Sequence, residues 1–241
     1  PMKLIEQNGA DAVRWYFFTV NQPWDSKLFN EADIKDASRR FFVILWNILQ
    51  FWKMYAGRQP GRLGGLAPGL PKAKLLINKW VLARLNSVAG AVTSKLDAYD
   101  IVGAARDLEN FVVEDVSRWY VRRIRDVMKE DSKKMKETGA VLGYLLAEIS
   151  KLLAPFAPFI SEKIWLELGN KKSIHLEDWP RGKTPGVKSA KTPAKTPGVE
   201  ERGLLGSMAE VRRIVGLALE ARQKAGIKVR QPLAKLEVKN K

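Results

Sequence analysis

The 241-residue sequence contains no cysteine and only one histidine, His175. The absence of cysteine excludes disulfides, thiolate metal sites and cysteine nucleophiles. A single histidine cannot build a multi-histidine metal site or a mechanism that needs two imidazoles. His175 follows a predicted helix in a stretch that reads as extended, so we expect a structural role for it. The sequence therefore predicts no metal ligands.

Long apolar runs and catalytic signatures are also missing. No run approaches the roughly 20 apolar residues that cross a bilayer, and no signal-peptide pattern is present. The glycine-rich stretch Gly61–Gly65 lacks the Lys-Ser/Thr that completes a phosphate-binding loop. Glu114 and Asp115 are sequence neighbours, which point about 100° apart on a helix and suit shared acid–base chemistry poorly. We expect a cytoplasmic chain with no catalytic residue and no membrane contact.

Positive charge is what the sequence has in excess. It holds 42 Lys and Arg against 26 Asp and Glu, for a formal net charge of +16. Such an excess attracts polyanions, and nucleic acid is the commonest partner of this kind. The alternative is a solvated surface with a basic tail. Because 46% of the residues are hydrophobic, a packed globular body is expected.

Apolar residues recur at steps of three and four along most of the chain, which is typical of amphipathic helices. The first 20 residues predict two short helices that are separated at Asn8-Gly9. Asn30 is a suitable N-cap for a long helix whose apolar face runs from Ile34 to Tyr55. Three more long helices are predicted, over residues 77–96, 105–127 and 141–152. The fold class is therefore all-α, an antiparallel helix bundle.

Breaks between these segments suggest a domain organisation. Residues 57–71 are rich in glycine and proline, 133–138 read as a polar connection, and Pro155 and Pro158 end the last long helix. The predicted domains are an N-terminal segment 1–30, a helical domain 31–180, a linker 181–200 and a C-terminal piece 201–241.

The linker differs in kind from the rest of the chain. Residues 181–199 repeat Lys-Thr-Pro three times and contain no acidic or aromatic residue, so we expect disorder. After it, a helix is predicted to stop at Gly226, and residues 227–233 and 236–238 alternate like strands. The C-terminal piece is thus expected to be a small helix-plus-strand appendage.

One cluster of arginines is a candidate nucleic-acid surface. If Val116, Tyr120, Ile124 and Val127 face the core, then the opposite face carries a basic stripe of Arg118, Arg122, Arg125 and Lys129. Guanidinium groups grip phosphates bidentately. The adjacent Trp119 could stack on an unpaired base. The alternative is an exposed charged face whose Trp119 packs on a neighbouring helix.

The first long helix adds further candidates. Its aromatic residues resemble an RNA platform, but their helical spacing favours a place in the core. These residues are Phe41, Phe42, Trp46, Phe51 and Trp52. The polar residues Arg39, Arg40 and Asn47 on the same helix are better candidates for contact with RNA.

Several motifs together resemble the class I aminoacyl-tRNA synthetases. Three motifs resemble the junction that follows the catalytic domain in that family: Gly9-Ala-Asp-Ala-Val-Arg-Trp-Tyr-Phe17, Gln22-Pro-Trp-Asp25 and Phe42-Val-Ile-Leu-Trp-Asn47. Three further segments resemble that family's helical anticodon-binding domain, namely Trp80–Asn86, Val113–Arg123 and Leu152–Phe159. His175–Pro180 and Ala225–Leu233 are similar to the isoleucine-specific members in particular.

The resemblance implies a function for the chain. It implies the tRNA-binding portion of an isoleucine–tRNA ligase, a monomer that positions isoleucine tRNA for a catalytic domain upstream. Arg123, Arg230 and Gln231, which lie in the matching motifs, join the candidate tRNA-binding residues. ATP and Mg would serve the parent enzyme, with no cofactor in this segment. The alternatives are a valine or leucine enzyme, or a free-standing helical RNA-binding or scaffold protein.

The two ATP-binding signatures of that family are missing from the sequence. Pro1-Met-Lys-Leu-Ile-Glu6 resembles the stretch that directly follows the second signature. We therefore expect the chain to begin just past the catalytic core and to be inactive by itself.

Overall fold

The computed structural model describes residues 2–22, 24–26, 29–56, 70–130, 133–180, 199–233, 235 and 237. These residues fall into two compact units, Pro1–Thr196 and Pro197–Lys241. Most of the Gly/Pro-rich stretch 57–71 and nearly all of the predicted linker 181–200 lie outside the described residues. The predicted domain boundaries and the predicted disorder of the linker stay predictions.

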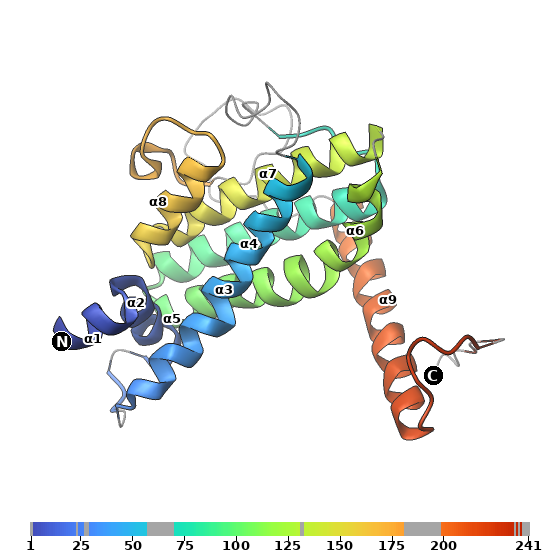
Figure 1. Cartoon of the computed structure of the whole chain (residues 1–241), viewed down its shortest axis with the longest axis horizontal. Helices are drawn as coiled ribbons and strands as arrows, with labels where there is room; N and C mark the ends of the chain where they lie inside the picture. Colours follow the sequence, from blue (N-terminus) through green and yellow to red (C-terminus); the bar gives the residue numbers. More distant parts are fainter. Residues whose placement is uncertain are drawn as a thin grey trace. The chain divides into compact units, whose positions relative to one another are not determined.

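The first unit is built from helices alone, in the part of the chain that the structure describes (Figure 1). Its elements are α1 (Met2–Asn8), α2 (Ala10–Thr19), α3 (Glu31–Ala56), α4 (Leu76–Asp97), α5 (Ile101–Asn110), η1 (Phe111–Val121), α6 (Arg122–Lys129), α7 (Lys133–Leu153), α8 (Pro158–Glu167) and the short η2 (Ile174–Leu176). Figure 1 shows α3 crossing the other long helices at an angle. The predicted all-α helix bundle is confirmed.

The core forms where the apolar faces of α3, α4, η1 and α7 meet. The predicted face of α3 is buried from Ile34 to Trp52, and the Trp52 indole N–H donates to the Gly139 carbonyl at 2.9 Å. Phe41 and Phe42 are also buried, as their helical spacing predicted. Burial of aromatic side chains of this size supplies much of the hydrophobic stabilisation of a bundle.

Local sequence signals determine where several helices begin. The Asn30 side chain accepts from the Ala32 N–H at 3.1 Å, and Asp100 accepts from the Gly103 N–H at 2.9 Å. A Cβ atom at position 103 would lie 2.0 Å from the Asp100 Oδ2 atom, so a larger residue there would force the capping carboxylate to move. Pro158 occupies the first turn of α8, where its missing N–H costs nothing.

The N-terminal helices are fastened to the bundle by polar contacts. The Asp11 carboxylate accepts from the Ile160 N–H at the start of α8, at 2.6 Å. The Arg14 guanidinium donates to the carbonyls of Pro155 and Phe156 at 2.8 and 2.9 Å. Trp15 stacks on Phe41 with ring centroids 4.2 Å apart. The motif that begins at Gly9 is therefore a docking element for the bundle.

Two details of the first unit differ from the sequence prediction. Residues 133–138 are not a polar connection but the first turns of α7, because Met135 and Thr138 are buried and anchor them. Val127 is only half-buried, and Met128 takes its expected place in the core.

The second unit contains α9 (Val199–Lys224), which ends before Gly226 with φ +67°. The predicted helix and its stop at Gly226 are confirmed. The predicted strand over 227–233 is wrong, because one Arg222 nitrogen donates to the carbonyls of Lys228 and Gln231, both at 2.9 Å. These bonds fold the segment into a turn. Most of 236–238 lies outside the described residues.

Candidate nucleic-acid interface

The candidate interface is built on η1, an eleven-residue π-helix that joins α5 to α6. Its i→i+5 hydrogen bonds make a wider helix than the α form. Such segments are rare in proteins, and those that occur often lie at functional sites. Trp119, Tyr120 and Val121 are all buried, although they are consecutive. The winding of η1 thus buries a broad face and leaves Arg118 and the arginines after it exposed.

Two acidic neighbours in η1 bind different arginines. Asp115 is 4% exposed, and its carboxylate receives the Nε and a terminal nitrogen of Arg84 at 2.9 and 2.8 Å. Glu114 lies outside the core and pairs with Arg118 at 2.5 Å, one turn later. The two carboxylates bind different partners, as expected for helix neighbours that point in different directions. Asp115, however, is a buried and ion-paired group rather than a solvated one.

A buried hydrogen-bond network fixes η1 against α4 and α7. The Tyr120 hydroxyl donates to the side-chain Oδ1 of Asn78 at 2.7 Å, and the Nδ2 group of the same amide donates to Glu137 at 2.9 Å. Burial raises the pKa of Tyr120 well above its usual value, so this hydroxyl keeps its proton. The network holds the back of η1 in one register.

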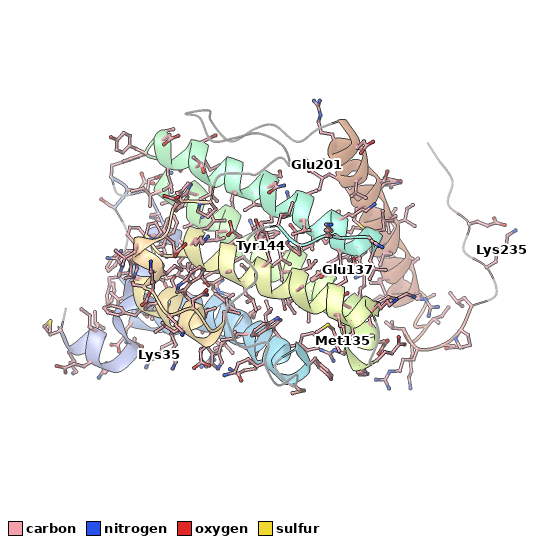
Figure 2. All side chains as sticks on the ribbon, turned by 90° about the horizontal axis from the view of Figure 1, so that it is seen from above. Lys35, Met135, Glu137, Tyr144, Glu201 and Lys235 are labelled. Carbon is pink, nitrogen blue, oxygen red and sulfur yellow. The ribbon has the colours of Figure 1, made fainter. Side chains whose placement is uncertain are left out.

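Glu137 closes this network at the start of α4 (Figure 2). Its carboxylate also accepts from the backbone N–H groups of Lys74 and Leu75, at 2.8 and 2.9 Å. Burial alone would raise the pKa of Glu137, but the hydrogen bonds from Leu75, Asn78 and Lys74 outweigh it, and the pKa is lowered. The ionised carboxylate therefore satisfies N–H groups that precede and begin α4.

A groove of about 700 Å³ runs between α3 and the η1–α6 segment. From α3 it is lined by Ile44, Asn47, Ile48 and Phe51. From η1 and α6 it is lined by Ser117, Arg118, Val121, Arg122 and Arg125. Four predicted contact residues, Asn47 and three arginines, thus come together around one groove.

The arginines of this groove differ in what they already bind. Arg118 is paired with Glu114, which satisfies part of its guanidinium. Arg122 and Arg125 are exposed and form no hydrogen bond or ion pair with another residue that the structure describes. Their donors are available to an anionic ligand, and a guanidinium matches phosphate geometry.

Trp119 and Arg123 form a pair beside the groove. The Arg123 guanidinium carbon lies 3.0 Å from the centroid of the Trp119 ring, and its Nη1 donates to the Trp119 carbonyl at 3.2 Å. Trp119 is 9% exposed. A base could stack on this ring only after displacing Arg123, so the geometry favours the packing interpretation of Trp119.

The other predicted contact residues are not among those that line the groove. Arg39 and Arg40 are exposed on α3, and the Arg40 Nε donates to the Asp36 carbonyl at 3.3 Å. Burial raises the pKa of Glu109, and the positive charges of Arg40 and Arg106 oppose that rise. Arg230 and Gln231 are exposed in the turn of the second unit. The structure does not join these four residues to the groove.

Sequence reasoning missed the apolar half of the groove. Ile48 belongs to the apolar face predicted from Ile34 to Tyr55, and Phe51 was assigned to the core with the other aromatics. No role was predicted for Ile44 or Val121. Ser117 lies within the Val113–Arg123 motif, and no role was predicted for it. The i, i+3, i+4, i+7 spacing of Ile44, Asn47, Ile48 and Phe51 does mark one face of α3. That signal shows a shared face but not what the face meets.

Two other classes of site find no support in the described ranges. No group of three or more His, Asp and Glu side chains among those residues could hold a metal ion. No helix within the described part is both long and apolar enough to span a membrane.

Comparison with known proteins identifies close sequence relatives. A family model described as the anticodon-binding domain of tRNA ligase matches residues 78–238. The chain is 35% identical to the isoleucine–tRNA ligase of Thermus thermophilus, over 99% of this chain and 22% of that protein. It is 34% identical to the isoleucine–tRNA ligase of Methanopyrus kandleri, over 99% of this chain and 21% of that protein. The chain thus spans about a fifth of the length of these relatives.

A solved structure shares the fold at lower sequence identity. The LeuRS of Agrobacterium radiobacter K84, solved in a ternary complex with tRNA and LeuAMS, matches with a TM-score of 0.53 and 21% identity. The match covers 75% of this chain and 20% of that one. It supports the helical architecture alone.

Proposed function

The chain belongs to the family of anticodon-binding domains of tRNA ligases, and from that premise we propose that it is the tRNA-binding portion of an isoleucine–tRNA ligase. In this role it orients tRNA for ATP-dependent charging by a catalytic domain of the same enzyme. The relatives named as isoleucine–tRNA ligases, similar over nearly the whole chain, support isoleucine as the amino acid.

The proposal rests on Arg122 and Arg125, which line the same groove. Both are exposed, and their N–H donors bind no other residue that the structure describes. A phosphate backbone is the ligand that such donors recognise. The formal net charge of +16 attracts an RNA before any specific contact forms. Arg39, Arg40 and the second unit's Arg230 and Gln231 are further proposed contacts.

The proposal assigns no cofactor to this chain. ATP and Mg belong to the charging reaction of the whole enzyme, which we assign to the catalytic domain. We further propose that the protein acts as a monomer in the cytoplasm.

A pull-down from total tRNA, followed by sequencing of what is retained, tests this function. We expect enrichment of isoleucine tRNA on the wild-type chain and a loss of retention for the Arg122→Ala/Arg125→Ala double variant. Enrichment of valine or leucine tRNA would reassign the amino acid. Retention of RNA without preference would favour a free-standing helical RNA-binding protein instead.

A further inference from the structure

The turn that follows α9 is folded around one arginine side chain. A single terminal nitrogen of Arg222 donates to the carbonyl oxygens of Lys228 and Gln231, both at 2.9 Å, and to that of Val229 at 3.4 Å. The Gln231 N–H donates to the Lys228 carbonyl at 3.0 Å, which closes a β-turn. Three carbonyl oxygens of the turn therefore point toward one guanidinium group.

These bonds also fix the direction of two backbone N–H groups. None of the described peptide bonds is cis, and in a trans peptide the C=O and N–H bonds point in opposite directions. Because the carbonyls of Lys228 and Val229 face Arg222, the N–H groups of Val229 and Arg230, which share those peptide planes, point away from it. Neither N–H group has a hydrogen-bond partner among the residues that the structure describes.

Positive side chains flank these two N–H groups. Lys228 and Arg230 are exposed, and neither side chain pairs with another described residue. The sequence contains no acidic residue from position 221 to position 233, and Glu220, just before this stretch, is already paired with Lys224 at 2.8 Å. Consecutive N–H groups in a turn form a concave site for an anion, and the two cations strengthen it.

The end of α9 does not oppose an anion at this turn. The last carbonyls of a helix carry a partial negative charge. Two of them are already bonded here, because the Ile227 N–H donates to the Arg222 carbonyl at 2.9 Å and the Gly226 N–H donates to the Gln223 carbonyl at 3.1 Å. Arg222 and Lys224 also add positive charge to the last turn of the helix.

We propose that the turn formed by residues 228–231 binds one phosphate group of an RNA backbone. The N–H groups of Val229 and Arg230 donate to the phosphate oxygens, and the Lys228 and Arg230 side chains supply charge. Arg222 is a positioning residue, because it holds the carbonyls back and does not itself touch the phosphate. The inference rests on the proposed function, since it takes RNA as the ligand.

Two substitutions of Val229 separate the backbone donor from the side chain. Proline suits the second position of a β-turn, so Val229→Pro should keep the turn and remove one N–H group. Val229→Ala is the matched control, because it trims the side chain and keeps the N–H group. With the full chain and tRNA, we expect Val229→Pro to bind about tenfold more weakly than Val229→Ala, the scale of one hydrogen bond to a charged group. Neither substitution changes the charge, so both should keep the wild-type salt slope.

A second set of variants tests the role of Arg222. Arg230→Ala should lower the magnitude of the log-affinity against log-salt slope by roughly 0.7–0.9, and it should do so in the Val229→Pro chain as well if the turn persists there. In the Arg222→Ala chain the same change should have little effect, because the turn no longer holds Arg230 in place. Arg202→Ala removes an equal charge from the opposite end of α9 and should leave the Arg230 effect whole.

The inference and the proposed function fail in distinguishable ways. If tRNA binds Val229→Pro and Val229→Ala equally, with the Arg230 effect intact in both, the N–H groups bind no phosphate, and only the turn site is overturned. If Val229→Pro abolishes the Arg230 effect, the Arg222 comparison decides: an Arg230 effect that is the same with and without Arg222 overturns the site. A wild-type chain that retains no tRNA contradicts the proposed function and the site together.

Discussion

The guanidinium of Arg123 lies over the ring of Trp119, 3.0 Å from the ring centroid, while Nη1 of the same arginine donates to the Trp119 carbonyl. A cation above an indole face is attracted by the ring quadrupole. Because Trp119 is only 9% exposed, its ring packs against Arg123 and is not a free surface for a ligand. The arginine is held beside Arg122, at the start of α6.

Loss of this ring should be a stability defect. Trp119→Ala removes a buried indole, so we expect the free energy of unfolding to fall by about 3–5 kcal/mol. Trp119→Phe leaves a smaller ring in place and should cost less. Denaturant titration of both variants measures the difference. A Trp119→Ala variant that melts like wild type yet loses RNA affinity would restore the base-stacking interpretation.

A second stability prediction concerns the buried carboxylate of Asp115. Arg84→Ala leaves that carboxylate without its guanidinium partner. Because the Arg84 side chain is 33% exposed, we expect a cost below the roughly 3–5 kcal/mol of breaking a fully buried pair. Arg84→Lys keeps the charge but loses the two-nitrogen contact, so its cost should be smaller. Equal stability of Arg84→Ala and wild type would show that the pair contributes nothing.

Acid should weaken the cap that Glu137 forms on α4. Its pKa is lowered in the folded chain, so its contribution is fully present above the ordinary glutamate pKa of about 4.3 and is lost as pH falls through the lower folded value. The stability difference between wild type and Glu137→Gln should shrink as pH drops from about 5 to below 4. Thermal melts across that range measure it, and a difference independent of pH contradicts the assignment.

Much of the fold follows from local chemistry that the sequence displays. Asn30 and Asp100 cap helices because their side chains accept from N–H groups two and three residues later. Pro158 begins α8 for an equally local reason. Exposure of Arg118, Arg122 and Arg125 on one side was predictable, because their spacing sets them opposite the apolar face.

What could not be predicted depends on contacts between distant segments. Trp119 is buried in the π-helical segment η1. Ordinary α-helical spacing had left both base stacking and packing on a neighbouring helix open for this residue. Asn47 meets the arginines only because α3 packs against η1, and no local signal encodes that pairing. Residues 227–233 alternate like a strand, but the Arg222 side chain binds their carbonyls instead.

The central claim is that the groove arginines hold RNA phosphates, and the salt dependence of tRNA affinity tests it most directly. Each phosphate contact releases condensed counterions, so removing one lowers the magnitude of the log-affinity against log-salt slope by roughly 0.7–0.9. We expect that decrease for Arg122→Ala and for Arg125→Ala, and a smaller one for Arg118→Ala because Glu114 already engages it. Lys79→Ala, on exposed α4 surface outside the groove lining, should keep the wild-type slope. Wild-type affinity and slope in all three arginine variants would contradict the account.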